Sequence, residues 1–320
     1  MAEWSQQSGS NRRPAVYKTA ALPLSYAGTF GWALIINACT DSANGFTTRL
    51  IRGKDSLPTP NPMVISSSSN ERIKHARRVR EGRERELIFV EGERLVGECI
   101  SSGLSLHACF TSAAPSPAQQ SLLERVSCPV HQLSESVLES LGDTMSTQGI
   151  IVIAERPQPS LDSFFASPAP LILGLDRIQD PGNFGTLVRT AESAGASGIF
   201  SFAGSTDAFA PKTLRSSMGS AFRLPILPDV SGLGVLETCR SRGIKTVVAT
   251  GEADLLHYDY DWRQPTLLIL GNEGRGASAD IMRTCDTRVR IPLHAPVESL
   301  NVAAAGAAIL FEAVRQRGLR

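Results

Sequence analysis

The stretch "LILGLDRIQDPGNFGTLVRTAESAGASGIFSFA", residues 171–203, joins two short apolar runs through a longer segment with helical spacing. The runs at 171–176 and 198–203 are almost continuously apolar, which is typical of strands buried on both faces. Between them, residues 183–195 form a predicted helix. A strand–helix–strand unit of this kind predicts two parallel strands joined by a crossover helix.

The same alternation continues to residue 317. The pattern predicts strands at 245–250, 266–271 and 288–293, and helices at 211–222, 234–243, 278–285 and 301–317. We therefore predict an α/β domain at 171–320, built on a parallel sheet with helices on both faces. In such sheets ligands bind where the C-terminal ends of the strands open into loops. The loops of interest are 176–183, 271–277 and 294–301.

Upstream of this domain, helical and strand-like segments are mixed in a way that predicts a small α/β domain at 63–156. Its predicted helices are 71–85, 93–103 and 134–142, and its predicted strands are 86–92, 106–112, 128–134 and 149–155. Four prolines fall within 156–170, too many for the interior of an element, so residues 157–170 are predicted to be a linker.

Residues 1–62 differ from the rest in being rich in Ser, Thr, Asn and Pro. Three interpretations stay open for this segment. Residues 22–39 resemble a diluted signal sequence, and the small number of acidic residues would also suit an organellar transit peptide. The third interpretation takes Met63 as the true start, because organised sequence begins just after it. We treat residues 1–62 as a disordered or non-native extension.

The overall composition excludes several classes of protein. The chain has 320 residues, 42% of them hydrophobic and 20% charged, and a formal net charge of +1, which describes a soluble globular protein without a strong overall field. Its six cysteines are scattered and form no C-x-x-C pair. We expect neither a disulfide framework nor a zinc site, and no metal is predicted.

Two polar loops follow predicted strands. Glycines 271, 274 and 276 fit neither the P-loop nor the G-x-G-x-x-G pattern, which argues against a dinucleotide enzyme. The stretch Asp180-Pro181-Gly182 turns the chain, and Asn183 then lies where a side chain can cap a helix. Arg189 follows one and a half turns later, within reach of a phosphate or ribose at the sheet edge.

Three motifs together resemble the SpoU/TrmH family of RNA 2′-O-ribose methyltransferases within the SPOUT superfamily. They are "DPGNFGTLVRTAESAG" (180–195), "LILGNEGRG" (268–276) and "IPLHAPVESLNVAAAGAAILFEA" (291–313). The segment "LRSSMGSAFRLPI" (214–226) is similar to the central part of that domain. Upstream, residues 66–96 resemble the RNA substrate-binding domain often fused to it, including the turn "FVEG".

The resemblance implies S-adenosyl-L-methionine as the methyl donor, bound by a deep C-terminal trefoil knot. It assigns a cofactor-binding role to Gly271, Asn272, Gly274, Ile291, Leu293 and Leu300. It assigns catalytic roles to Arg189, Asn183, Glu273, Ser299 and Asn301. Whether Arg189 acts as a base or only holds the 2′-oxygen stays open, although a guanidinium stays protonated at neutral pH and suits the second role. The small residues between 303 and 308 would let the last helix pack closely.

The family also implies a homodimer in the cytoplasm, acting on RNA without a membrane or a metal. Residues 71–85 carry seven Arg or Lys against three Glu, which suits phosphate contacts. The predicted RNA-binding residues are Arg72, Lys74, Arg77, Arg78 and Arg80. A structured RNA is expected, and the extra domain favours ribosomal over transfer RNA. The alternatives are a transfer RNA methyltransferase and a non-catalytic RNA-binding protein of the same fold.

Overall fold

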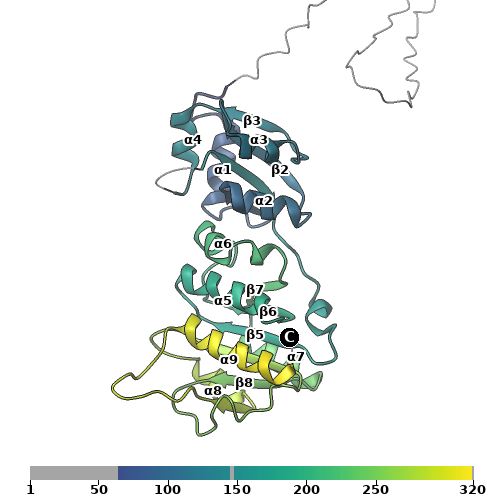
Figure 1. Ribbon diagram of the computed structural model, residues 1–320, viewed down its shortest axis with the longest axis vertical. Helices are drawn as coiled ribbons and strands as arrows, with labels where there is room; N and C mark the ends of the chain where they lie inside the picture. Colours follow the sequence, from purple (N-terminus) through teal and green to yellow (C-terminus); the bar gives the residue numbers. More distant parts are fainter. Residues whose placement is uncertain (1–63, 145–147, 319–320) are drawn as a thin grey trace, which may run out of the picture. The chain divides into compact units, whose positions relative to one another are not determined.

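The computed structural model describes residues 64–144 and 148–318. The interpretations of residues 1–62, and of Met63 as a start, lie outside the described residues. Within them, the strands form two separate sheets, one of four strands and one of six (Figure 1). The predicted α/β fold class is confirmed. The exact limits of the two domains stay predictions, as does the trefoil knot.

The larger sheet has six strands, and all its pairings are parallel. Its order is β10-β8-β9-β5-β6-β7. The first predicted strand, β5, lies beside β9, which leads to the loop at 271–277, called the glycine loop below. The strands are β5 (Leu171–Asp176), β6 (Gly198–Phe202), β7 (Ile226–Val230), β8 (Lys245–Ala249), β9 (Thr266–Gly271) and β10 (Thr287–Val289). The prediction of a parallel sheet is confirmed.

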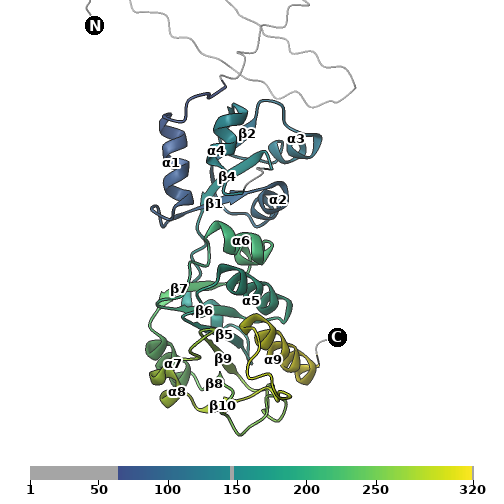
Figure 2. The same cartoon turned by 90° about the vertical axis from the view of Figure 1, so that its left-hand side faces the viewer.

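Helices cover both faces of this sheet, so its strands are buried on both sides (Figure 2). Along β5, Leu171, Leu173 and Leu175 belong to the core under α5 and α9, whereas Ile172 belongs to the core under α7 and α8. The helices are α5 (Pro181–Ser193), α6 (Pro211–Ser217), α7 (Gly232–Ser241), α8 (Ala279–Thr284) and α9 (Val302–Arg317). This two-sided burial explains why the strands are almost continuously apolar.

The last helix packs closely on its neighbours, as its small residues predicted. A Cβ atom added to Gly306 would lie 2.4 Å from Cδ2 of Leu187 in α5 and 2.8 Å from Cδ1 of Leu270 in β9. The C-terminal end of α9 is also tied down. The side chain of Gln316 accepts the Trp262 N–H at 2.9 Å, and the Arg317 guanidinium donates to the Ala169 carbonyl at 2.6 Å. The C-terminal helix is therefore bonded both to the segment before β9 and to the segment before β5.

Two predicted elements of this domain were wrong in extent, and one strand was missed. The helix predicted at 211–222 breaks at Met218, which has a φ of 53°, and a short 3-10 helix (Ser220–Phe222) follows. The strand predicted at 288–293 ends at Val289. Beyond it, the Arg290 N–H donates to the Leu255 carbonyl and the Arg290 carbonyl accepts the His257 N–H, so the chain pairs there with a neighbouring loop. The edge strand β7 was missed.

The smaller sheet has the order β1-β4-β2-β3, with one parallel pair, β2 and β3. Its strands are β1 (Leu87–Glu91), β2 (Leu106–Ser112), β3 (Val130–Leu133) and β4 (Ile150–Glu155). Its helices are α1 (Glu71–Arg80), α2 (Glu93–Ser101), α3 (Pro117–Leu123) and α4 (Glu135–Leu141). Helices α1 and α4 share one apolar core on this sheet. The helix predicted at 71–85 is shorter, since the chain turns at Gly82 with a φ of 71°.

The predicted linker contains one ordered turn. A 3-10 helix (Leu161–Phe165) places Phe164 in the core, where its ring stacks on Phe200 with centroids 4.5 Å apart. Across residues 64–144 and 148–318, no helix is both long enough and apolar enough to cross a membrane.

Candidate functional site

Three of the predicted catalytic side chains form one chain of hydrogen bonds. The Asn183 side chain donates to Oε1 of Glu273 at 3.1 Å, and its carbonyl oxygen accepts from Nδ2 of Asn301 at 2.9 Å. These residues come from the start of α5, the loop after β9 and the start of α9. Glu273 and Asn301, which lie 90 and 118 positions after Asn183 in the sequence, therefore meet it at one point. We call Asn183, Glu273 and Asn301 the amide relay.

Each member of the amide relay is held by the helix or loop that carries it. The Asp180 carboxylate caps α5 by accepting the Asn183 N–H at 2.8 Å, and this bond is the main reason that the pKa of Asp180 lies below its usual value. Asn301 caps α9 by accepting the Ala303 N–H at 2.9 Å. The backbone of Asn183 and the side chain of Asn301 are therefore held in place before any ligand binds.

The amide relay leaves donors free for a ligand. An asparagine amide has two N–H donors. Asn183 uses one on Glu273, and Asn301 uses one on Asn183, so each has a second N–H to offer. An oxygen of a ribose or phosphate can accept both. The relay is thus suited to holding an oxygen-rich ligand in place.

The glycine loop is organised by Asn272. Its side-chain oxygen accepts the N–H groups of Gly274 and Arg275, each at 3.1 Å, while its side-chain nitrogen donates to the Arg177 carbonyl at 2.9 Å. The backbones of Asn272 and Gly276 also exchange two hydrogen bonds. Of the predicted cofactor-binding residues, Asn272 therefore has a clear role in shaping the loop.

Arg189 lies apart from the amide relay. It is exposed on α5 and borders a shallow groove formed with Thr186, Thr190, Ser193, Ser216 and Phe311. Among the described residues its guanidinium has no hydrogen-bond or ion-pair partner. Ser299 is also exposed and makes no hydrogen bond within that part of the chain. The structure thus brings together Asn183, Glu273 and Asn301, and among the described residues neither Arg189 nor Ser299 makes a side-chain hydrogen bond or ion pair with them.

The loop before α9 presents its backbone to solvent. From Pro292 to Leu300 every residue is exposed, and the only hydrogen bond made there between described residues joins the Val297 N–H to the His294 carbonyl at 3.1 Å. Leu293 and Leu300 are 37% and 43% exposed, while Ile291 packs against the core. These free backbone groups and apolar side chains fit the predicted recognition of a cofactor through backbone contacts.

Sequence reasoning missed a second carboxylate at this edge. Asp176 at the end of β5 is 3% exposed and accepts the Ser278 N–H at 2.6 Å, while its other oxygen binds Nε of Arg177 at 3.2 Å. Arg177, with a φ of 56°, also reaches the Gly276 carbonyl at 3.4 Å. The sequence signal that could have identified Asp176 was an acidic residue at the end of a continuously apolar strand. These two residues fasten the glycine loop to β5.

The predicted RNA-binding residues divide into two groups. Arg77 donates to Ser140 at 2.9 Å, and Arg80 donates to the Leu141 and Gly142 carbonyls at 2.9 and 2.8 Å, so both brace the end of α4. Lys74 and Arg78 pair with Glu71 and Glu84 at 2.7 and 2.8 Å. In contrast, Arg72 is exposed and makes no ion pair within the described chain, and the same holds for Arg85, which belongs to the basic stretch at 71–85 but was not among the predicted RNA-binding residues. Within residues 71–85, called the basic segment below, these two guanidinium groups are available to bind phosphate.

This division leads to a prediction for the basic segment. The double change Arg72→Gln with Arg85→Gln is expected to lower RNA affinity and to reduce the slope of log affinity against log salt by about two, because each phosphate contact contributes about one unit. Filter binding over a range of KCl concentrations measures both. Stability should be unchanged in a thermal melt, whereas Arg80→Gln should destabilise the α4 end. An unaltered salt slope would mean that this segment is a solvated face.

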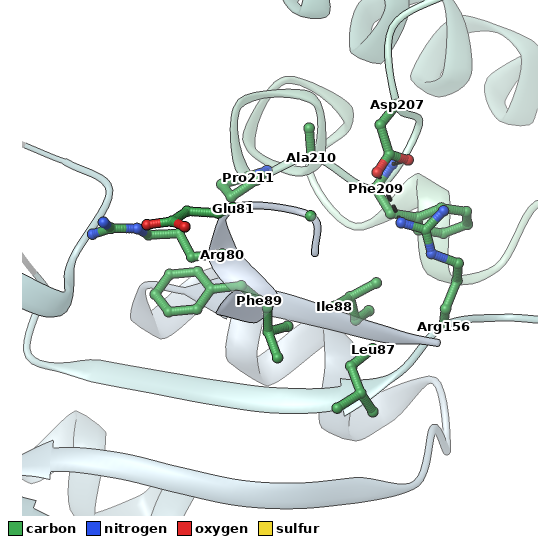
Figure 3. A pocket seen from close by; sticks show the side chains of 12 residues that line it. Arg80, Glu81, Leu87, Ile88, Phe89, Arg156, Asp207, Phe209, Ala210 and Pro211 are labelled. Carbon is green, nitrogen blue, oxygen red and sulfur yellow. Dashed lines mark hydrogen bonds and ion pairs between the residues drawn. The ribbon is translucent and has the colours of Figure 1, made fainter. Parts of the chain in front are cut away.

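A second concave region lies beside α1 and is shown in Figure 3. Residues 79–82 and 87–89 line it together with Arg156, Asp207 and 209–211. Arg156 donates to Asp207 at 2.8 Å and stacks 4.9 Å above the Phe209 ring. Its charge is therefore already neutralised. In the described residues, no group of three metal-ligating side chains is found in this region or elsewhere.

Comparison with known proteins covers both sheets. Residues 170–311 match the SpoU rRNA Methylase family, and residues 70–152 match the MRM3-like substrate binding domain. An uncharacterized tRNA/rRNA methyltransferase of Synechocystis is 33% identical over 79% of this chain and 94% of its own length. The 23S rRNA (guanosine(2553)-2'-O)-methyltransferase RlmP of Bacillus subtilis is 30% identical over 77% and 97%.

Solved structures give the same result. The SpoU methyltransferase AviRb from Streptomyces viridochromogenes, in complex with the cofactor AdoMet, superposes with a TM-score of 0.72 at 30% identity. The superposition covers 78% of this chain and 99% of that one. Both the fold and the arrangement of a substrate-binding domain before a methylase domain are therefore shared with proteins of this kind.

Proposed function

Because this chain belongs to the SpoU rRNA methylase family, we propose that it transfers a methyl group from S-adenosyl-L-methionine to a ribose 2′-hydroxyl of ribosomal RNA. The family, the α/β fold and the enzyme class predicted from the sequence are confirmed. The observation that carries the proposal is the amide relay, which joins the loops after β9 and before α9 to the start of α5.

The methyl donor supplies an electrophilic carbon on a positively charged sulfur. In the proposed reaction the 2′-oxygen would bond to that carbon as the carbon–sulfur bond breaks, which leaves S-adenosylhomocysteine, and the hydroxyl proton would pass to solvent water. The sulfonium is already reactive, so the protein must chiefly hold the 2′-oxygen in line with the methyl carbon. The free N–H groups of Asn183 and Asn301 are suited to this task, and Glu273 keeps Asn183 correctly turned.

We propose that Arg189, which lies apart from the amide relay of its own subunit, acts on the 2′-oxygen and its neighbouring phosphate at the site of the second copy in the homodimer. A guanidinium stays protonated in proteins and presents a planar set of donors that matches phosphate. Its lack of a partner within the described residues leaves that set available. We therefore propose that Arg189 lowers the energy of the developing oxyanion and does not itself remove the proton.

The cofactor is proposed to bind where the glycine loop meets the loop before α9. Gly271, Gly274, Ile291, Leu293 and Leu300 would contact it through backbone groups and apolar side chains. The exposed backbone from 292 to 300, which makes a single hydrogen bond within the described chain, supports this assignment. Ser299 is proposed to join the site once the cofactor orders that loop.

Homodimerisation is part of the proposal. Phe311 on α9 is 49% exposed beside Arg189, and Val297 is 52% exposed in the loop before α9. Covering such side chains with a second copy would bury apolar area next to the catalytic arginine. We expect sedimentation to give a dimer at micromolar concentration and Phe311→Asp to give a monomer. A monomeric wild-type protein would contradict this part of the proposal.

The substrate assignment is tested by mapping 2′-O-methyl sites in a deletion strain and its parent. The loss of one site in ribosomal RNA, restored by the wild-type gene, is the expected result. A site lost from transfer RNA would show that transfer RNA is the substrate instead. An unchanged map would favour a non-catalytic RNA-binding protein. Since ribosomal RNA is the proposed substrate, we propose the cytoplasm as the place of action.

A further inference from the structure

Most arginines of the described chain have an assigned partner. Ten form ion pairs with carboxylates, and six others donate only to hydroxyl or carbonyl groups. The remaining arginines in that part of the chain have neither kind of bond. They are Arg72, Arg85, Arg94, Arg189, Arg275 and Arg290. Arg275 stands out among them, because it belongs to the glycine loop that contributes Glu273 to the amide relay.

The backbone of Arg275 is fixed while its side chain is free. Its N–H donates to Oδ1 of Asn272 at 3.1 Å, within the turn that the Asn272 and Gly276 backbones close. The side chain is exposed and makes no hydrogen bond or ion pair with any described residue. The loop therefore presents a charge from a well-defined position.

The neighbouring charges do not compensate Arg275. Glu273 accepts from Asn183 and lies 3.5 Å from the Gln179 N–H, so its carboxylate is directed toward α5. Asp176 is engaged by Arg177 and by the Ser278 N–H. An arginine without an ion-pair partner among the described residues, in the loop that carries Glu273, can bind an anion that comes from solvent.

From these observations we propose that Arg275 contacts a backbone phosphate of the RNA next to the target ribose. This inference rests on the function proposed above and adds a phosphate site to the catalytic loop, separate from the basic segment at 71–85. Every ribose in a chain has phosphates on its two sides, so a ribose held by the amide relay brings one near the glycine loop. The cofactor also carries an anion, its carboxylate. Exposure of the Arg275 side chain favours the RNA, which approaches from solvent.

The test compares Arg275→Gln, Arg275→Lys and the control Arg283→Gln in the full chain. Arg283 is 71% exposed on α8 and is paired with Asp280, so its replacement removes the same charge at a different place. The probe is a protein-free transcript of large-subunit ribosomal RNA, bound at several KCl concentrations. Titration with S-adenosylhomocysteine measures the cofactor site separately.

We expect Arg275→Gln to weaken RNA binding about fivefold and to reduce the salt slope by about one. The KM for RNA should rise while kcat at saturating RNA and the affinity for S-adenosylhomocysteine stay near wild type. Arg275→Lys should recover most of the affinity, and Arg283→Gln should match wild type.

Unchanged RNA affinity and slope in Arg275→Gln would overturn the inference. Weaker S-adenosylhomocysteine binding with unchanged RNA binding would overturn it in favour of the cofactor carboxylate. If the wild-type protein binds but does not methylate the transcript, the proposed function fails instead.

Discussion

Replacing Arg189 with alanine is expected to lower the rate of methyl transfer by about a hundredfold to a thousandfold, the usual effect of removing a donor to a developing oxyanion. The side chain makes no hydrogen bond or ion pair with the described residues, so its loss should not disturb the fold. Single-turnover methylation at saturating RNA measures the rate of the chemical step. Calorimetric titration with S-adenosylhomocysteine should give a nearly unchanged affinity.

Two further variants make this result specific. Arg189→Lys keeps the charge but not the planar set of donors, so it should recover little of the rate. Arg263→Ala removes another exposed arginine, which is paired with Asp261 in the segment between β8 and β9, and this variant should react like wild type. Full transfer by Arg189→Ala would disprove the assigned role even with the fold and family unchanged.

The change Gly271→Ala should abolish cofactor binding for a reason that lies within the loop itself. An added Cβ atom would stand 2.1 Å from the Ala277 nitrogen and 2.2 Å from the Gly276 carbonyl carbon. Both are backbone atoms, so the clash cannot be relieved by a side-chain rotation. The loop must open, at a cost of about 1–3 kcal/mol typical of overpacking. A lower melting temperature and loss of S-adenosylhomocysteine binding should appear together.

Gly274 provides the matched control. A Cβ atom there would come no closer than 3.8 Å to Oδ1 of Asn272, and no unusual φ requires a glycine. Gly274→Ala should therefore keep its stability, and any loss of affinity in it would report a direct contact with the cofactor. A fully stable Gly271→Ala protein that binds the cofactor normally would show that the loop does not have the closed form described.

Much of the fold was predictable because the apolar pattern follows directly from burial on two faces. The strand β5 is apolar at almost every position, which only a covered parallel strand requires. The edge strand β7 was missed because "ILPDV" contains Pro228 and Asp229, residues that disfavour strands. Helix α3 was missed although Ser116 and Gln119 form a capping box, a signal present in the sequence.

The candidate site was predictable only in part. Periodicity placed Asn183, Glu273 and Asn301 at loop ends, but their mutual hydrogen bonds depend on how those loops fold in three dimensions. The bracing roles of Arg77 and Arg80 required knowing that α4 lies beside α1. The chemistry itself came from the family resemblance, since no single motif specified methyl transfer.

The amide relay has a consequence for the timing of synthesis. Asn301 is made 118 residues after Asn183. At about 5–20 residues per second, the ribosome takes about 6–24 seconds to add that length. During this interval the amide relay stays incomplete, first without Glu273 and then without Asn301, and Gly306 is not yet present to contact Leu187 and Leu270. The amide relay is therefore complete, and Leu187 and Leu270 are covered, only after α9 has been synthesised and has docked.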